Sequence, residues 1–164
     1  MQILNHYQIS HKISRIAYEI LERHEDDQLI HLVGINNNGF RFAALVYDQL
    51  ISISNKQFEL SRLHINPVNP IEYPVKSEVE AEQFNGKSVI LIDDVANTGR
   101  TLFYTFSAFM NTLPKRVEVA VLVDREHKVF PVNVDYFGLS LATTVQDNIR
   151  AKLNDDGDFK VVLE

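Results

Sequence analysis

Hydrophobic and polar positions along the chain follow two spacings, which predict helices and strands in alternation. Apolar residues recur three and four positions apart in stripes typical of amphipathic helices, at Ile9–Leu21, Phe42–Leu50 and Gly99–Asn111. Short, nearly continuous apolar runs are typical of buried strands, and they lie at Leu29–Ile35, Phe58–Ile65, Ser88–Ile92, Val117–Val123 and Val134–Phe137. The first helix begins with a capping-box pattern, Asn5 followed three residues later by Gln8.

The polar segments between these runs predict the connections. Asn36–Gly39 is a polar turn, and Asp155–Gly157 is a turn before a terminal strand at Phe159–Leu163. Residues Asn66–Asn85 contain three prolines within eight positions, which excludes a regular helix and predicts an irregular excursion. Alternating strands and helices, with strands apolar on both faces, predict an α/β fold with a mainly parallel sheet flanked by helices. We expect one domain over residues 1–164, with a small hood or excursion.

Composition limits where in the cell the protein is expected and which kinds of site it can form. The chain has 164 residues, a formal net charge of −6 and no cysteine, which excludes disulfides, thiolate metal sites and a cysteine nucleophile. The amino terminus has no secretory pattern, and no apolar run approaches the roughly 20 residues of a membrane span. These features predict a soluble cytoplasmic protein without a membrane partner. The negative net charge gives no support to nucleic-acid binding through the phosphates.

The most informative segment is the run from Val89 to Leu102, which reads VILIDDVANTGRTL. A buried strand carries the adjacent carboxylates Asp93 and Asp94 to its end, and a loop of small residues then enters a helix. Backbone N–H groups at such a helix start can hold an anion, Gly99 permits close approach of a phosphate, and Thr98 and Thr101 add hydroxyl donors. A ribose 5-phosphate offers both the hydroxyls that carboxylates bind and the phosphate. The dipeptides taken alone also fit a turn and a helix cap.

The complete segment resembles the ribose-phosphate loop of the type I phosphoribosyltransferases. Further stretches resemble the PyrR family of pyrimidine-operon attenuators and uracil phosphoribosyltransferases, namely Ser14–Glu19, Ile30–Gly34, Ala120–His127, Pro131 and Asp135–Gly138. The likeness covers most of the chain except Gln57–Gly86.

This resemblance implies that 5-phosphoribosyl-1-diphosphate and a nucleobase react to give a nucleoside monophosphate and diphosphate. Asp93 and Asp94 would bind the ribose hydroxyls. The 5-phosphate would be held by Ala96, Asn97, Thr98, Gly99, Arg100 and Thr101. Mg²⁺ would be held chiefly by substrate oxygens, with no direct protein ligand.

The resemblance also bears on the base. Relatives that use 6-oxopurines carry an acid at the place of Asn97 and a lysine at the place of Asp124, and this chain has neither. Purines are therefore disfavoured, and uracil is expected, with Asp124, Tyr136 and Phe137 as base-binding residues. The two aromatic side chains fit a place in the core equally well.

Two segments depart from the family pattern. The diphosphate loop, which normally supplies lysine or arginine, reads Asn36, Asn37, Asn38 and Gly39, so Arg41 in the next helix is the candidate substitute. The excursion, expected to form the family's hood over the site, is short and poor in basic and aromatic residues. A loosely closed site would admit water and reduce catalysis.

Three functions follow: an enzyme, a nucleotide-responsive RNA-binding regulator of pyrimidine genes, and a homologue that binds ligand with little turnover. For the regulator, basic side chains of the first helix and of the last third of the chain would form the RNA surface. The family resemblance also implies a homodimer.

Overall fold

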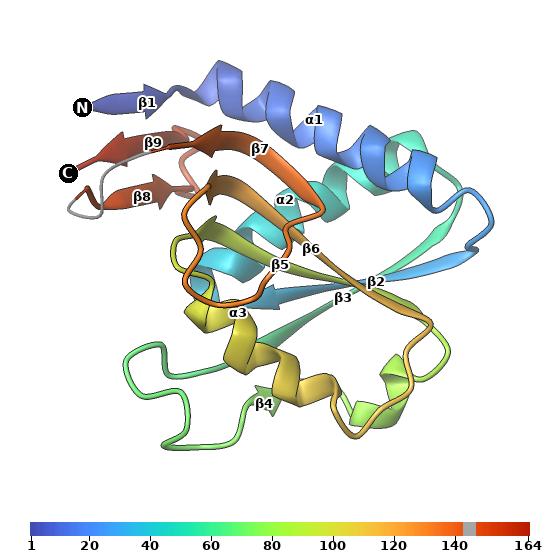
Figure 1. Ribbon diagram of the computed structural model, residues 1–164. Coiled ribbons are helices and arrows are strands. Elements are labelled where there is room, and N and C mark those ends of the chain that lie inside the picture. Colours follow the sequence, from blue (N-terminus) through green and yellow to red (C-terminus); the bar gives the residue numbers. More distant parts are fainter. Residues whose placement is uncertain (143–146) are drawn as a thin grey trace.

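The computed structural model describes residues 1–142 and 147–164, and in it helices and strands alternate as the hydrophobic pattern predicts (Figure 1). The strands are β1 (Gln2–Leu4), β2 (Leu29–Ile35), β3 (Gln57–His64), β4 (Lys76–Ser77), β5 (Ser88–Ala96), β6 (Arg116–Arg125), β7 (Tyr136–Leu141), β8 (Ile149–Lys152) and β9 (Lys160–Leu163). The helices are α1 (His6–Arg23), α2 (Asn36–Ile53) and α3 (Arg100–Thr105), with short 3₁₀ turns η1 (Ala81–Phe84) and η2 (Phe106–Phe109).

The main sheet has six strands in the order β4-β3-β2-β5-β6-β7. Its neighbours from β3 to β7 pair in parallel, and β4 pairs antiparallel with β3. The expected α/β class with a mainly parallel sheet is therefore confirmed. Strands β2, β5 and β6 are apolar on both faces because both faces of the sheet are covered.

Alternate residues of each central strand enter two separate cores. Ile90 and Ile92 of β5 pack in the cluster formed with α1 and α2, while Val89 and Leu91 pack in the cluster formed with α3 and η2. Figure 1 shows α1 and α2 on one side of the sheet and α3 on the other. This sandwich fixes β5 in the middle of the molecule, and the site described below lies at its end.

Helix boundaries follow local chemistry. The predicted capping box is present: Gln8 N–H donates to Asn5 Oδ1 at 2.9 Å, and Asn5 N–H donates to Gln8 Oε1 at 3.0 Å. The helix predicted at Gly99–Asn111 is shorter than expected, since α3 ends at Thr105 and continues as the 3₁₀ turn η2. Aromatic and β-branched residues crowd this segment, and their low helix propensity accounts for the early end.

The chain termini form a second, antiparallel sheet in the order β1-β9-β8. Of these three strands only β9 was expected, at Phe159–Leu163. The excursion adds β4 to the edge of the main sheet, and its Val68 carbonyl accepts from Arg100 at 3.5 Å. Both the excursion and the terminal sheet therefore lie at the carboxyl ends of the main strands (Figure 1). The terminal sheet is assembled from residues far apart in the sequence.

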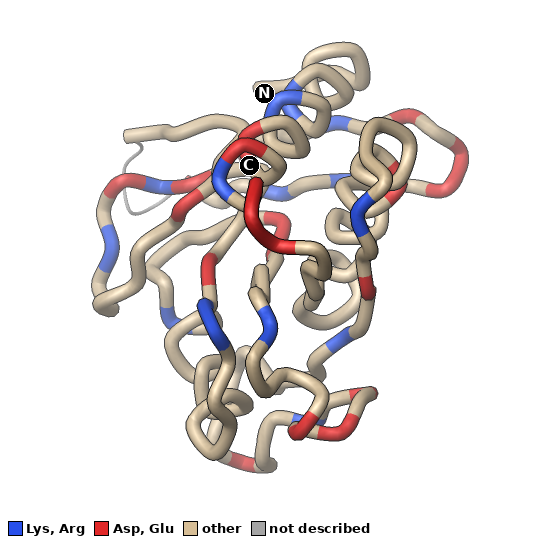
Figure 2. Tube along the Cα trace, turned by 90° about the vertical axis from the view of Figure 1, so that its right-hand side faces the viewer, with Lys and Arg blue, Asp and Glu red and all other residues tan. Residues whose placement is uncertain are grey.

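A buried polar cluster ties α1 to the amino ends of β5 and β6. His24 lies between two carboxylates, with Nδ1 2.7 Å from Asp27 Oδ2 and Nε2 2.5 Å from Glu118 Oε1. Ser88 also donates to Asp27, at 2.7 Å, and Lys115 at 2.5 Å. Figure 2, which views this end of the molecule, shows acidic and basic positions interspersed along the trace.

These hydrogen bonds govern the ionisation of Asp27. Burial alone would raise the pKa of Asp27, but hydrogen bonds from Lys115, Ser88 and His24 outweigh it and hold that pKa well below its usual value. The carboxylate therefore stabilises the folded state in its charged form.

No helix in the described part of the chain is long and apolar enough to cross a membrane.

We predict that Asp27→Asn lowers the free energy of unfolding near neutral pH by about 3 kcal/mol, because the partners of a buried charge are left uncompensated. The pKa of Asp27 is lowered on folding, so its contribution is present above the usual aspartate pKa and is lost as pH falls through the lowered value. The deficit of the variant should therefore shrink on acidification. Denaturant unfolding measures it, with Asp26→Asn at the exposed neighbour as control. Equal midpoints for the two variants near neutral pH would contradict this account.

Candidate functional site

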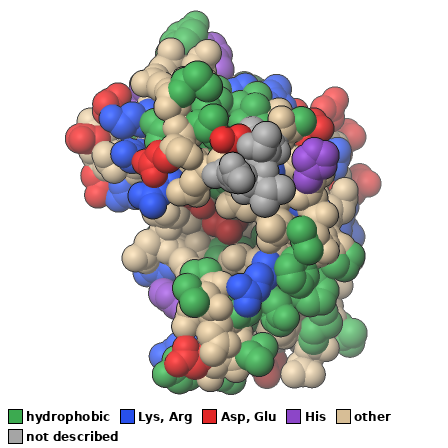
Figure 3. Space-filling model, turned by 60° about the vertical axis from the view of Figure 1, so that its left-hand side comes forward, with side chains coloured by type: hydrophobic (Ala, Val, Ile, Leu, Met, Phe, Trp, Pro, Cys, Tyr) green, Lys and Arg blue, Asp and Glu red, His purple; other side chains and the backbone are tan. Residues whose placement is uncertain are grey.

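Two adjacent carboxylates mark the carboxyl end of β5. Asp93 and Asp94 are still within the strand, both partly buried, and the Asp94 N–H donates to Asp93 Oδ1 at 2.9 Å. Figure 3, which looks toward this end of the sheet, shows acidic atoms at the bottom of a hollow. In parallel α/β sheets, ligands bind in the crevice at the carboxyl ends of the strands. The carboxylate pair therefore lies where this fold class binds ligands.

The surroundings disfavour the charged form of both groups. Burial raises the pKa of Asp93 well above its usual value, and repulsion from the Asp94 carboxylate raises it further. Burial also raises the pKa of Asp94. A ligand that brings hydroxyl donors or a cation to the pair would relieve this cost.

The predicted phosphate loop follows directly. Gly99 has φ 85°, in the left-handed region that favours glycine, and α3 begins with the next residue. Of the amides from Asn97 to Thr101, that of Arg100 is the one that donates to a protein oxygen in the described residues, to Thr98 Oγ1 at 3.3 Å. The loop thus presents backbone donors to a ligand.

The same loop encloses a small cavity of about 60 Å³, lined by Asp93 and by residues 95–102. The neighbouring strand end supports it: Arg125 Nη1 donates to Asn97 Oδ1 at 3.2 Å, and the Thr98 carbonyl accepts from Val129 and Phe130 at 2.9 and 3.1 Å. The cavity has room for one small anion such as a phosphate and is too small for a sugar or a base.

The residues of the predicted diphosphate loop are the first turn of α2 rather than a separate turn. Helix α2 begins at Asn36, directly after β2, and Asn36 itself has φ 52°, which asparagine tolerates better than most residues. Its side-chain Oδ1 accepts from the Ile65 N–H at 2.9 Å, and its Nδ2 donates to the Ile65 carbonyl at 3.0 Å. A Cβ on Gly39 would lie 2.8 Å from the Ile92 carbonyl oxygen and 3.0 Å from Asp93 Oδ1. The absence of a side chain at Gly39 therefore lets α2 approach the carboxylate pair.

Arg41 links α2 to the terminal sheet. Its guanidinium donates to the Leu153 carbonyl at 2.5 Å and forms an ion pair with Asp155. A cavity of about 680 Å³ lies at this junction, and its lining includes Asn37, Asn38, Arg41, Asp94, Asn97 and residues 149–154. Its volume lies in the range of small-molecule sites. The structure therefore brings the predicted diphosphate, ribose and phosphate residues together around adjoining cavities.

The three residues predicted to bind the base have different environments. Asp124, at the end of β6, is paired with Lys128. Phe137 of β7 is 38% exposed. It pairs with Val121 of β6, which in turn pairs with Asp93 of β5, so Phe137 and Asp93 lie at the same level of the sheet.

Of the two interpretations given for the Tyr136 side chain, the structure supports the place in the core. Its side chain is fully buried, and its hydroxyl donates to both carboxylate oxygens of Glu118 at 3.1 Å. Burial and the adjacent Glu118 carboxylate raise the pKa of Tyr136. Tyr136 is thus a core residue that cannot stack on a base.

Two parts of the site were missed from the sequence. The cavity wall at residues 149–154 belongs to β8, whose alternation of Ile149, Ala151 and Leu153 with polar residues is a strand signal. Arg62, in β3, donates to Asn37 Oδ1 at 3.2 Å, a contact that no local pattern indicates.

Comparisons with known proteins agree with this geometry. The family described as "Phosphoribosyl transferase domain" matches residues 1–155. "Bifunctional protein PyrR" of Elusimicrobium minutum is 33% identical over 95% of this chain and 92% of its own length. "Pyrimidine operon regulatory protein" of Lactococcus lactis subsp. lactis is 29% identical over 99% of this chain and 96% of its own length.

Solved structures show the same fold. The hypoxanthine phosphoribosyltransferase of Trypanosoma cruzi superposes with a TM-score of 0.76 at 18% identity, covering 98% of this chain and 94% of that one. A hypoxanthine-guanine phosphoribosyltransferase of Bacillus anthracis superposes with a TM-score of 0.71 at 20% identity, covering 85% of this chain and 81% of that one. With the matches over almost the whole chain, these findings show that the protein belongs to the phosphoribosyl transferase domain family and, within it, to the PyrR family.

Proposed function

We propose that the protein transfers the phosphoribosyl group of 5-phosphoribosyl-1-diphosphate to a pyrimidine base, most favourably uracil. The observation that carries this proposal is the direct succession, at the end of β5, of the partly buried carboxylate pair and a loop whose amides, except that of Arg100, have no acceptor among the described residues. Asp93 and Asp94 would accept hydrogen bonds from the ribose hydroxyls, and the amides of residues 97–101 would hold the 5-phosphate. The two contacts fix the sugar between β5 and the first turn of α2.

The arrangement supports transfer by charge stabilisation. As the bond from the ribose to diphosphate breaks and a base nitrogen forms the new bond, positive charge develops on the sugar ring. Carboxylates already held in place beside that ring stabilise this charge without further reorganisation. The terminal sheet, which walls the larger cavity through β8, limits the access of water to the reacting atoms.

Magnesium fits this site. Paired carboxylates with raised pKa values favour a cation close by, and Mg²⁺ prefers oxygen ligands and keeps water and substrate ligands. When bound with the diphosphate, it would supply neutralising charge to the leaving group, and Asp93 and Asp94 would hold it through the ribose hydroxyls or water.

Several features support a pyrimidine base. Relatives that use 6-oxopurines have an acid near the base where this chain has the amide of Asn97. They also have a lysine facing the purine oxygen where this chain has Asp124, which is paired with Lys128. The names of the relatives refer to PyrR and to a pyrimidine operon. Phe137, exposed and level with Asp93, remains a proposed contact of the base.

A regulator is the second candidate, because relatives of this length are named as pyrimidine operon regulatory proteins. The basic residues proposed for RNA are partly engaged: Arg15 donates to the Gly138 carbonyl at 2.7 Å, and Arg150 pairs with Glu164 at 3.3 Å. Binding to RNA, the homodimer and the cytoplasmic location stay predictions.

Replacing both carboxylates tests the catalytic proposal. Asp93→Asn with Asp94→Asn should reduce diphosphate release from 5-phosphoribosyl-1-diphosphate, uracil and Mg²⁺ by about 100-fold or more, the usual loss when one preorganised electrostatic contact is removed. An Asp26→Asn variant, exposed at the amino ends of the strands, is the control. Undiminished turnover in the double variant would refute the assigned role.

The same double variant should be more stable than the wild type near pH 8. Because the pKa values of Asp93 and Asp94 are raised on folding, their contribution to stability is greatest below the usual aspartate pKa and is lost as pH rises through the raised values. The variant's advantage in Tm should therefore shrink toward about pH 4, near the usual pKa. Thermal unfolding at both pH values measures the difference, and a Tm below that of the wild type near pH 8 would contradict the pKa directions.

Base preference is tested by thermal shift with UMP, GMP, IMP and AMP at equal concentration. A ligand that binds only the native state raises the Tm, and at equal concentration the tighter ligand raises it more, so UMP should give the largest shift. A larger shift with GMP or IMP would assign the site to purines.

Filter binding of pyrimidine-leader RNA at two salt concentrations tests the regulator. Binding through phosphates weakens steeply as salt rises, so a regulator should bind at low salt and lose affinity at high salt. RNA retention that is absent, or equal at both concentrations, would count against this function.

A further inference from the structure

The loop proposed to bind the diphosphate has no charged side chain of its own, and the cations in its cavity, Arg41, Arg150 and Lys152, come from α2 beyond the loop and from β8. Asn36 is bound to the Ile65 backbone through both polar atoms of its amide, so its side chain is committed to the fold. Asn37 and Asn38 are exposed and line the larger cavity, but their amides carry no charge. Arg41 is held by Asp155 and the Leu153 carbonyl. A cation directly beside this loop would give the diphosphate a charge-assisted contact that the amides cannot give.

Arg62 stands next to this loop. It pairs in register with Gly34 of β2, so its side chain emerges beside the point where β2 turns into α2. Its Nη1 donates to Asn37 Oδ1 at 3.2 Å, and its Cζ lies 4.6 Å from the centre of the Phe40 ring. Planar guanidinium groups stack on aromatic faces in this way, which holds the charge in a defined place.

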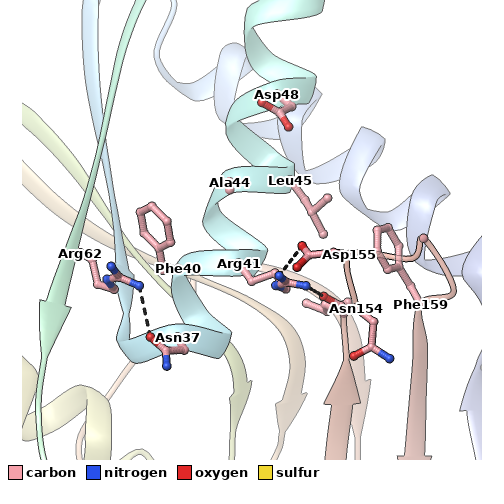
Figure 4. A pocket seen from close by; sticks show the side chains of 12 residues that line it. Asn37, Phe40, Arg41, Ala44, Leu45, Asp48, Arg62, Asn154, Asp155 and Phe159 are labelled. Atoms are coloured by element: carbon pink, nitrogen blue, oxygen red, sulfur yellow. Dashed lines mark hydrogen bonds and ion pairs between the residues drawn. The ribbon is translucent and has the colours of Figure 1, made fainter.

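The contact with Arg62 also orients Asn37. Because Oδ1 accepts from the guanidinium, Nδ2 is turned away from Arg62, as Figure 4 shows. Arg62 and Arg41 line one cavity of about 620 Å³, and Asn37 and Arg41 also line the cavity that contains Asp94. The side chain of Asn37 therefore stands between Arg62 and the site of the carboxylate pair.

On this basis, and resting on the proposed function, we infer that Arg62 is a positioning residue for the diphosphate of 5-phosphoribosyl-1-diphosphate. It holds Asn37 with the amide N–H groups directed at the diphosphate, and its charge replaces the lysine or arginine missing from the loop. A guanidinium has five N–H donors, and the contacts to Asn37 and Glu78 use two of them. Among the described residues, its other three N–H groups donate to no protein acceptor and can therefore serve an anion.

Glu78 opposes this role. Its Oε1 accepts from Arg62 Nε at 2.9 Å and lies 3.0 Å from His64 Nε2, so the excursion places a carboxylate on the same cation. If the Arg62–Glu78 pair served only to fasten the excursion to β3, removing either partner would have the same effect on ligand binding. If Arg62 serves the diphosphate, the two removals have opposite effects.

The test is isothermal titration calorimetry with two probes, 5-phosphoribosyl-1-diphosphate with Mg²⁺ and UMP, of which only the first carries a diphosphate. Arg62→Gln should weaken binding of the first probe about tenfold, the scale of one charge-assisted hydrogen bond, and leave UMP binding unchanged. Arg62→Lys, which keeps the charge, should lie between this variant and the wild type. Glu78→Gln should tighten binding of the first probe about twofold to threefold, the scale of an exposed ion pair.

Equal weakening by Arg62→Gln and Glu78→Gln, parallel loss of UMP binding, or unchanged binding in Arg62→Gln would each overturn the inference while leaving the proposed function standing. A wild-type protein that binds neither probe would overturn the proposed function, and the inference with it. Thermal unfolding of each variant confirms that the fold is retained, since Arg62 and Glu78 are both partly exposed.

Discussion

The burial of two adjacent carboxylates, Asp93 and Asp94, at the end of β5 is the constraint on which the site depends. Burial raises the pKa of both groups, and repulsion from the Asp94 carboxylate raises that of Asp93 further. Such an arrangement persists only where the surrounding structure holds it, and here β5 lies in the middle of the sheet between two apolar cores. The free energy spent on the pair is recovered when a sugar or a cation binds. Stability and ligand binding are therefore opposed at these two positions.

The rest of the site is placed by the ends of parallel strands. The turn after β5 supplies backbone amides, the start of α2 after β2 supplies asparagines, and β3 supplies a guanidinium. Gly39 allows α2 to approach the carboxylates, and Gly99 allows the phosphate loop to turn into α3. In the proposed function, the sheet brings these elements within reach of one phosphorylated sugar. The terminal sheet then adds a wall through β8.

Sequence patterns predicted the features that depend on residues close together in the chain. The run Leu29–Ile35 is a strand with those bounds, and the Asn5–Gln8 capping box is present, because both depend on neighbouring residues. The segment from Asp93 to Thr101 could be interpreted because one stretch of chain carries the strand end, the loop and the helix start. Contacts between distant segments could not be predicted. Tyr136 enters the core because Glu118 of another strand meets its hydroxyl, and Arg62 meets Asn37 only because β3 lies beside β2. Strands β1 and β8 were missed for the same reason, since the terminal sheet joins segments from both ends of the chain.

The central claim is that backbone amides of residues 97–101 hold a phosphate while the neighbouring acids hold its sugar. Titration of ¹⁵N-labelled protein with UMP, followed by amide NMR, tests this claim most directly. The amide signals of Asn97, Thr98, Gly99 and Thr101 should move downfield together as they donate to the phosphate, and inorganic phosphate should move the same signals. Shifts confined to other segments, with these four amides unchanged at saturation, would contradict the account.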